Sequence, residues 1–558
     1  MKKILEDWPQ KLLLIFVLII IGAYSLNQIR GDFDTYYHLA AGRYFAETGQ
    51  IRTGDIFSYT NPGGLWITHE WLAQVLFFYI YYFWGIWGLI YFSAALAVIT
   101  YFFVYKLGKQ LGANPYLVTL LIFPLAYLTL ELWIPRPQIF SYLFFILAVI
   151  LIEKLMRDKD WAAFLLIGLI WLWANVHASV IFGLIVIFGY LGAEIVKKIM
   201  APKLGADVLS GQTLKKLAVT AMASFGVAFL NPNTYKAVFY FRYIGDAVKQ
   251  LNTQEWAPLQ NFLNIPQAKM FLAILIAVVM FFALKFYLED DKKNFTRMGL
   301  ILGVALMPFI SIRYIAYFPL VAVPFLAAEI GELPWSERLN QSIQKLWVLL
   351  VAFFCILGAL FLGLRLTHLF KQPVDTSVMP VAAVDFITSS GLKGPGLSYS
   401  HDGGYLEWKL WPGDKVFLDS KSETYAGTPA KDYATIIKTW PGWEDLLNNK
   451  YKINYFLLSY DQPIIKNTAP LIQKLLTDEG FSLVFWDDAG VVLVRNAKEN
   501  KDIIKKYGLT LINPFLDPAT LSAKQVKPAL TEAVNMLERS ESDNVKFFVG
   551  RLVATHPK

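Results

Sequence analysis

The chain has 558 residues and a mass of 63.5 kDa. Hydrophobic residues make up 56% of it and charged residues only 17%, and its mean hydropathy is +0.44. This composition excludes soluble globular, disordered and collagen-like proteins and indicates a multi-pass α-helical membrane protein. The net charge of +8 lies mainly in loops between apolar segments, so it does not indicate a nucleic-acid partner.

Apolar segments of bilayer-crossing length, about 20 residues, recur between residues 11 and 366. We predict about eleven transmembrane helices, at residues 11–28, 86–105, 115–131, 138–155, 161–176, 178–197, 215–231, 267–286, 296–311, 314–331 and 345–366. A further stretch, residues 71–84, is equally apolar but rich in Trp and Tyr. Because these side chains suit the headgroup zone, we expect it to be re-entrant or interfacial.

Basic residues gather in alternate loops between these segments. The clearest pairs are Lys106 and Lys109, Lys154 and Arg157, Lys197 and Lys198, Lys215 and Lys216, Lys285 and Arg297, and Arg338 and Lys345. The positive-inside rule assigns such loops to the cytoplasm. The N-terminus is therefore expected inside the cell and the C-terminal region outside.

Hydropathy falls near Gln372, where a mixed α/β pattern begins. We predict a transmembrane module over residues 1–371 with a first outer loop at 28–70, an extracytoplasmic α/β domain over 372–500, and a helical appendage over 501–558. Strands are expected at 396–400, 415–418, 455–459 and 481–495, and helices at 381–389, 433–439 and 469–477. The appendage shows no readable activity.

Polar residues on the outer side are the candidates for a functional site, because polar groups at membrane depth are costly and usually line one. The predicted outer loops supply Asp32, Asp34, His38, His69, Glu70, Arg136, Gln138, His177, Glu255 and Arg313. The predicted cytoplasmic loops show no comparable set.

Asp32 and Asp34 lie two residues apart, and in an extended segment their side chains point to the same side. Two such carboxylates suit a divalent cation, Mg²⁺ or Mn²⁺, or a general base with an orienting partner. Asp34 also fits the N-cap of the helix that follows, and this role is compatible with catalysis.

The order and spacing of these segments resemble the GT-C superfamily of polytopic glycosyltransferases, and in particular bacterial GT-C-like membrane proteins of poorly defined activity. The similar segments are residues 31–43, 69–72, 136–138, 175–177, 255–256, 403–408 and 415–419. The resemblance implies a polyprenyl-phosphate-linked sugar donor and a glycan, lipid or protein acceptor. It also implies a multi-pass protein of the bacterial plasma membrane whose outer side carries out an inverting transfer with an Asp or Glu base.

The residues can be given roles within this chemistry. Asp34 is the first choice for the base that deprotonates the acceptor, and Asp32 the second. Arg313 and Arg136 are expected to bind the donor phosphate through two-pronged guanidinium contacts, although Arg136 also fits an interfacial anchor. The remaining expected substrate contacts are Glu70, His69, Glu255, His177, His38 and Gln138. For the histidines the alternative is a structural hydrogen bond, and for His38 also a metal ligand.

Two other functions stay open from the sequence. One is a non-enzymatic transporter or binder of lipid-linked glycans, which should show polar residues on both faces. The other is an oligosaccharide ligase or polymerase, which would use a histidine or arginine in place of the aspartate base. Motifs of zinc hydrolases, ATPases and nicotinamide enzymes do not occur in the sequence.

Overall fold

The computed structural model describes residues 8–26, 29, 32–204, 208–245, 254–288, 295–333, 336–369, 373–459 and 469–556. Gly31 and the predicted boundary at Gln372 lie outside the described residues. The chain forms two compact units. Unit 1 comprises residues 1–28, 68–240 and 253–373, and unit 2 comprises residues 29–67, 241–252 and 374–558.

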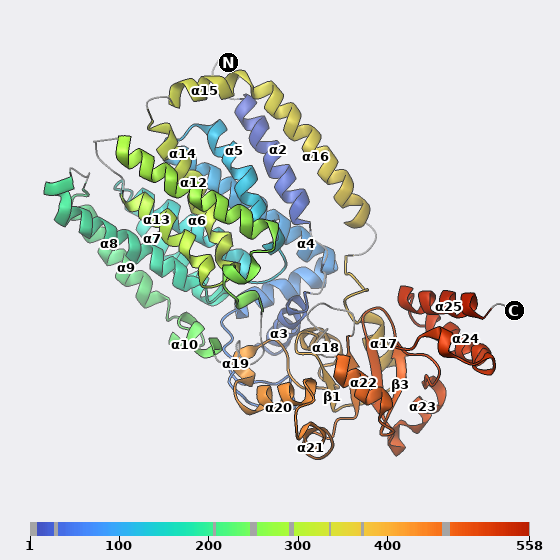
Figure 1. The fold of residues 1–558 in the computed structure, drawn as a ribbon. Helices are drawn as coiled ribbons and strands as arrows, with labels where there is room; N and C mark the ends of the chain where they lie inside the picture. The colour runs from blue at the N-terminus through green and yellow to red at the C-terminus, as the bar shows by residue number, and fades with distance from the viewer. Residues whose placement is uncertain are drawn as a thin grey trace. The chain divides into compact units, whose positions relative to one another are not determined.

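The described part of unit 1 is helical (Figure 1). Its main helices are α2 (Trp8–Ser25), α4 (Trp71–Gln110), α5 (Pro115–Ala126), α6 (Gln138–Leu155), α7 (Trp161–Val176), α8 (Val180–Leu204), α9 (Gly211–Val227), α12 (Pro266–Leu288), α13 (Phe295–Leu306), α14 (Tyr317–Gly331), α15 (Ser336–Lys345) and α16 (Trp347–Leu369). Short helical turns join them: η1 (Tyr127–Leu132), α10 (Tyr235–Val238), η2 (Gln254–Trp256), η3 (Leu259–Phe262), η4 (Met307–Phe309) and η5 (Ile312–Ala316).

Each predicted transmembrane segment overlaps a helix of unit 1. Among the described residues, eight helices are long and apolar enough to cross a membrane, while Trp161–Val176 and Phe295–Phe309 are apolar but shorter. The helix at the predicted segment 215–231, α9, belongs to neither group. α6 and α14 form the centre, where the rings of Phe145 and Tyr317 are buried with centroids 4.9 Å apart. α12 and α16 instead expose apolar side chains such as Met280 and Ile356, as expected of lipid-facing helices.

The stretch at residues 71–84 is the first part of α4. The helix is kinked at Gly85, whose φ of 61° and ψ of −159° are readily adopted only by glycine. Tyr82, Phe83 and Trp84, just before the kink, are all exposed. This separates residues 71–84 from the rest of α4, and their interfacial position stays a prediction.

Unit 2 is a mixed α/β body. Its helices include α3 (Asp34–Thr48), α17 (Val381–Ser390), α18 (Gly403–Leu410), α19 (Ser422–Tyr425), α20 (Thr428–Ile437), α21 (Trp443–Asp445), α22 (Ala469–Thr477), α23 (Lys501–Tyr507), α24 (Ala523–Leu537) and α25 (Asp543–Thr555). Short turns are η6 (Leu446–Lys450), η7 (Lys498–Asn500) and η8 (Pro518–Thr520). The sheet has the strands β1 (Gly396–Ser398), β2 (Tyr455–Leu458), β3 (Phe481–Trp486) and β4 (Val491–Arg495) in the order β1-β2-β4-β3.

The strand register follows the apolar pattern of the sequence. β1 pairs in parallel with β2, with Leu397 opposite Phe456, and β4 pairs antiparallel with both β2 and β3. One predicted strand, residues 415–418, is wrong. Val416 forms only an isolated bridge with Ser58, because the chain turns after Leu418 into a buried polar cluster.

Residues 29–67 of the first predicted outer loop belong to unit 2. α3 lies against α18, and the rings of Tyr36 and Tyr405 meet edge to face at 4.8 Å. A Cβ atom on Gly404 would lie 2.6 Å from the carbonyl oxygen of Phe33, so this approach requires glycine. The predicted appendage is helical and joins the same unit, since Phe548 packs on Trp486 of β3 at 5.8 Å.

Candidate functional site

The residues proposed from the sequence fall in both units. Asp32, Asp34 and His38 belong to unit 2. Unit 1 holds the others, namely His69, Glu70, Arg136, Gln138, His177, Glu255 and Arg313. The two units are therefore described one after the other.

An arginine cluster in unit 1 contains Arg136, Gln138, Glu255 and Arg313. Arg136 precedes α6, Gln138 begins it, Glu255 lies on η2 and Arg313 on η5. The Glu255 carboxylate lies between the two guanidinium groups, 3.1 Å from Arg136 Nη1 and 3.7 Å from Arg313 Nη1. Arg313 Nη2 donates a hydrogen bond of 2.5 Å to Gln138 Oε1. Four positions predicted as substrate contacts are thus brought together.

The ionisation of Glu255 follows from its two arginine neighbours. Burial raises the pKa of the Glu255 carboxyl, but the guanidinium groups of Arg313 and Arg136 outweigh this effect and hold it below its ordinary value. Glu255 is therefore ionised, and its single negative charge is shared by the two guanidinium groups. Arg313 also lies over the Trp256 ring, 4.5 Å from its centroid. Such a fixed cationic surface is suited to a phosphate group.

A histidine cluster lies beside it, built from His69, Glu70, His177, Ser141 and Ser179. Glu70 Oε1 is 3.4 Å from Nε2 of both His69 and His177. On its other side, His177 Nδ1 is 2.6 Å from Ser179 Oγ and 3.1 Å from Ser141 Oγ. His177 is thus held between a carboxylate and two hydroxyl groups, an arrangement that fixes its ring.

The two clusters adjoin along α6. Gln138 and Ser141 are three residues apart and share one face of the helix. The Tyr314 ring is 4.9 Å from Phe182, which follows the histidine cluster in the chain, and 6.5 Å from Trp256 of the arginine cluster. The seven predicted residues of unit 1 thus form two clusters, which α6 and the Tyr314 ring link.

The acidic element of unit 2 differs from its expected geometry. Phe33 has helical φ and ψ values of −75° and −20°, so Asp32 and Asp34 are not in an extended segment. Asp34 is the first residue of α3, and the N-cap position belongs to Phe33. Asp32 Oδ2 accepts a hydrogen bond of 2.6 Å from Thr35, while Asp34 Oδ1 accepts one of 2.5 Å from Ser420. The two carboxylates have different partners.

The expected divalent cation has no ligand set in this arrangement. In the part of the chain that the structure describes, no three His, Cys, Asp or Glu residues are grouped to hold a metal ion. His38 shares a helix face with Asp34, but it is buried and its ring packs on Tyr37 with centroids 4.0 Å apart. The residues present do not fit Mg²⁺ or Mn²⁺, and no step is assigned to one.

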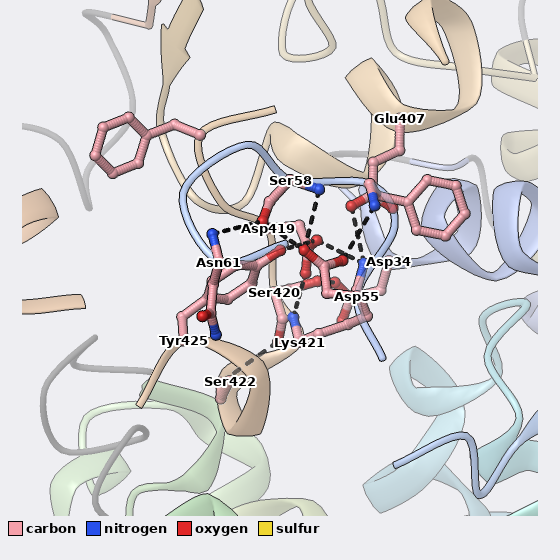
Figure 2. A network of polar contacts seen from close by, with 12 residues as sticks. Asp34, Asp55, Ser58, Asn61, Glu407, Asp419, Ser420, Lys421, Ser422 and Tyr425 are labelled. Carbon is pink, nitrogen blue, oxygen red and sulfur yellow. Dashed lines mark hydrogen bonds and ion pairs between the residues drawn. The ribbon is translucent and has the colours of Figure 1, made fainter. Parts of the chain in front are cut away.

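A buried lysine cluster, which the sequence did not predict, supports Asp34. It consists of Glu407, Asp419, Lys421 and Tyr425, none more than 4% exposed. Lys421 Nζ lies 2.5 Å from Asp419 Oδ2 and 2.8 Å from Glu407 Oε1, and Tyr425 donates to Asp419 at 2.6 Å. Figure 2 shows Asp34 beside this cluster, joined to it through Ser420. Because Ser420 precedes Lys421, anchoring the lysine also fixes the hydroxyl that holds Asp34.

The protonation of the lysine cluster follows from its burial. Burial and the neighbouring Asp419 raise the pKa of Glu407 well above its ordinary value. For Asp419, burial acts in the same direction, but Lys421 and hydrogen bonds outweigh it and lower its pKa. We therefore assign one ion pair, Lys421 with Asp419, and a neutral Glu407 at neutral pH. The sequence gives only a weak indication of this cluster, namely that Glu407 and Asp419 each follow apolar residues.

Asp402, the residue before α18, is a buried carboxyl in unit 2. Neither of its oxygens accepts a hydrogen bond from a described residue, and His401 Nε2 lies 3.4 Å from Oδ1. Burial raises its pKa from 3.8 to about 6. Its neighbours Gly403 and Gly404 begin α18.

Asp402 is expected to make unit 2 less stable as the pH rises. Between pH 4 and pH 6 the folded state keeps a proton that the unfolded state releases, so the free energy of unfolding falls, by up to about 3 kcal/mol. Asp402→Asn should remove this part of the slope in urea unfolding measured from pH 4 to pH 7.5. The pKa of Asp487 is also raised to about 6, so its contribution to the slope should remain in wild type and in Asp402→Asn. An unchanged slope would contradict the prediction.

Comparison with known proteins shows the fold but no sequence family. No family model and no curated protein matches the sequence. The solved structures that match include three of oligosaccharyltransferases from Archaeoglobus fulgidus. Archaeal oligosaccharyltransferase AglB, in complex with an inhibitory peptide and a dolichol-phosphate, has a TM-score of 0.54 and 11% identity over 88% of this chain and 74% of its own. The oligosaccharyltransferase in the apo form has a TM-score of 0.58 and 10% identity over 88% of this chain and 75% of its own.

The third structure is the oligosaccharyltransferase tethered by a disulfide bond to an acceptor peptide containing the NVT sequon. Its TM-score is 0.55, with 11% identity over 88% of this chain and 74% of its own. These similarities confirm the expected GT-C fold, with a polytopic helical part and a C-terminal α/β part. The chain is a multi-pass membrane protein with this fold.

Proposed function

We propose that this protein is a glycosyltransferase that moves a sugar from a polyprenyl-phosphate-linked donor to an acceptor on the extracytoplasmic side of a bacterial plasma membrane. The observation that carries the proposal is the arginine cluster of unit 1, where two guanidinium groups face one carboxylate. The GT-C fold supports it, because one protein with this fold was solved with a dolichol-phosphate, which is also a polyprenyl phosphate.

The donor phosphate is assigned to Arg313 and Arg136. When the bond between the anomeric carbon and the phosphate oxygen breaks, that oxygen takes the electron pair and gains negative charge. A guanidinium group stays protonated and donates two parallel hydrogen bonds, so it stabilises this leaving group. Glu255 holds both arginines in place, and its remaining acceptor capacity suits a sugar hydroxyl.

The base is assigned to Asp34, with Asp32 as the second choice. As the acceptor oxygen bonds to the anomeric carbon from the side opposite the phosphate, its proton passes to the Asp34 carboxylate, and the sugar configuration inverts. The hydrogen bond from Ser420 fixes one oxygen of Asp34. His69, Glu70, His177, His38 and Gln138 remain proposed substrate contacts or supports of such contacts. The acceptor class, glycan, lipid or protein, stays open.

Arg313→Gln is expected to weaken polyprenyl phosphate binding by at least about tenfold, because a charge-assisted contact is lost. In this variant Arg136 still lies 3.1 Å from Glu255, but one of the two guanidinium groups that face this carboxylate is lost. Native mass spectrometry of the detergent-purified chain with added polyprenyl phosphate measures the effect. Arg313→Lys should bind with intermediate strength, since lysine keeps the charge but not the planar fork.

Two comparisons make this result specific. Lys269 is exposed on α12, so Lys269→Gln is a control that also removes one positive charge. This variant should leave binding of polyprenyl phosphate unchanged. The uncharged polyprenol should bind wild type and Arg313→Gln equally, because it lacks the phosphate. Equal loss of polyprenol and polyprenyl phosphate would overturn the assignment of Arg313 to the phosphate.

A further inference from the structure

The end of unit 1 where α2 begins and α4 and α6 finish contains a basic hollow. It has a volume of about 650 Å³ and lies at the end that the loop charges assign to the cytoplasm. Four lysines line it, together with apolar and amide side chains. The lysines are Lys11 of α2, Lys106 and Lys109 of α4, and Lys154 of α6.

These lysines differ from other basic residues of the same unit. Lys285 and Arg297 pair with Glu329 at 2.5 and 3.3 Å, and Lys216 pairs with Asp160 at 2.7 Å. By contrast, within the described ranges none of the four lysines of the hollow has a carboxylate within ion-pair distance. The hollow therefore concentrates positive charge that described acidic side chains do not neutralise.

An apolar groove continues from the basic hollow along α2. Its volume is about 480 Å³, and its lining is apolar, with Ile15 and Ile19 of α2, Val98 of α4 and Leu362 of α16. Ile15 lines both hollows, so the lysines lead directly into the groove. Lys11, Ile15 and Ile19 are spaced four residues apart on one face of α2. A molecule with a charged head group and an apolar tail could thus lie along a single face of α2, with its head group near Lys11 and its tail near Ile15 and Ile19.

We propose that this surface binds an anionic phospholipid, with the phosphate among the four lysines and an acyl chain along Ile15 and Ile19. Charge complementarity selects an anionic head group, since basic residues at the membrane surface attract acidic lipids. The groove selects a lipid over a soluble anion, because each buried methylene of a chain adds to binding. The site is separate from the arginine cluster and does not depend on the proposed transfer reaction.

The test measures lipid retention by native mass spectrometry of the detergent-purified full chain. Wild type should retain phosphatidylglycerol roughly tenfold more than phosphatidylcholine with the same acyl chains. The variant Lys106→Gln/Lys109→Gln/Lys154→Gln should lose this preference. A matched variant, Lys159→Gln/Lys198→Gln/Lys215→Gln, removes the same charge from exposed lysines outside the hollow and should keep it.

A second variant addresses the acyl chain. Ile15 is 47% exposed, so Ile15→Trp is expected to fold while filling the start of the groove. It should reduce phosphatidylglycerol retention with all four lysines present. Equal retention of both lipids by wild type, or equal losses in the two lysine variants, would overturn the proposal. Displacement of phosphatidylglycerol by millimolar inorganic phosphate would also overturn it, because the site would then be one for soluble anions.

Discussion

Sugar transfer is expected to fall about 10²–10⁴-fold when Asp34 is replaced by asparagine, because the amide cannot accept the acceptor proton. Asparagine has nearly the same shape, and its carbonyl oxygen can still accept the hydrogen bond from Ser420. The loss should therefore appear as slower transfer in a protein that remains folded and retains its donor. Native mass spectrometry of co-purified lipids tests this directly: Asp34→Asn should keep the glycosylated polyprenyl phosphate, and wild type the spent lipid.

Changes at Ser420 separate the base from its support. Ser420→Ala removes the hydrogen bond of 2.5 Å that holds one oxygen of Asp34, so transfer should become slower because the carboxylate is no longer fixed in one orientation. Ser420→Thr keeps the hydroxyl and should restore most of the transfer rate. Donor retention, measured by native mass spectrometry, should stay at the wild-type level in both variants. A parallel loss of bound donor in Ser420→Ala would show that Ser420 supports the fold instead of the base.

The experiment with Asp34→Asn also discriminates among the functions left open by the sequence. Activity that survives Asp34→Asn but disappears in His177→Ala would contradict the aspartate base. It would favour a ligase or polymerase that uses the histidine cluster, where His177 lies between Glu70 and two serine hydroxyls. Identical intact glycolipid on wild type and Asp34→Asn would instead favour a binder or transporter.

Hydropathy predicted the helical architecture because lipid-facing helices must be apolar over their whole length. Because polar groups at membrane depth are costly and usually line a site, the sequence also indicated the polar positions of unit 1. Arg136, Glu255 and Arg313 are far apart in sequence, and Arg136 and Arg313 each interrupt an apolar region, yet the structure brings the three together. Short continuous apolar runs likewise located the strands around Phe456 and Val492, and these strands pair in one sheet.

Long-range packing is what the sequence pattern could not reveal. Residues 415–418 have the composition of a strand, but a strand also needs a neighbour with free backbone groups, and Val416 meets Ser58 at a single bridge. The spacing of Asp32 and Asp34 suggested a shared ligand, although the helical conformation of Phe33 gives them separate partners. Nothing local predicts that Lys421 is buried, because lysine normally lies at the surface.

Removing the buried lysine is expected to destabilise unit 2 more than any other change at a single charged residue. Lys421→Met leaves the ionised Asp419 without its cation, which typically costs about 3–5 kcal/mol. The loss can be measured on the detergent-purified chain as the urea concentration at which unit 2 becomes sensitive to a short protease pulse. Lys415 lies in the same segment but is exposed, so Lys415→Met should change stability by less than about 0.5 kcal/mol.

Two further variants show whether charge is the cause. Because the pKa of Glu407 is raised well above its ordinary value, its side chain is already neutral at neutral pH, and Glu407→Gln should have little effect. In Lys421→Met/Asp419→Asn both members of the ion pair are neutral, so the double variant should be more stable than Lys421→Met alone. A double variant no more stable than the single one would show that packing of the lysine stem, rather than its charge, holds Ser420 and Asp34 in place.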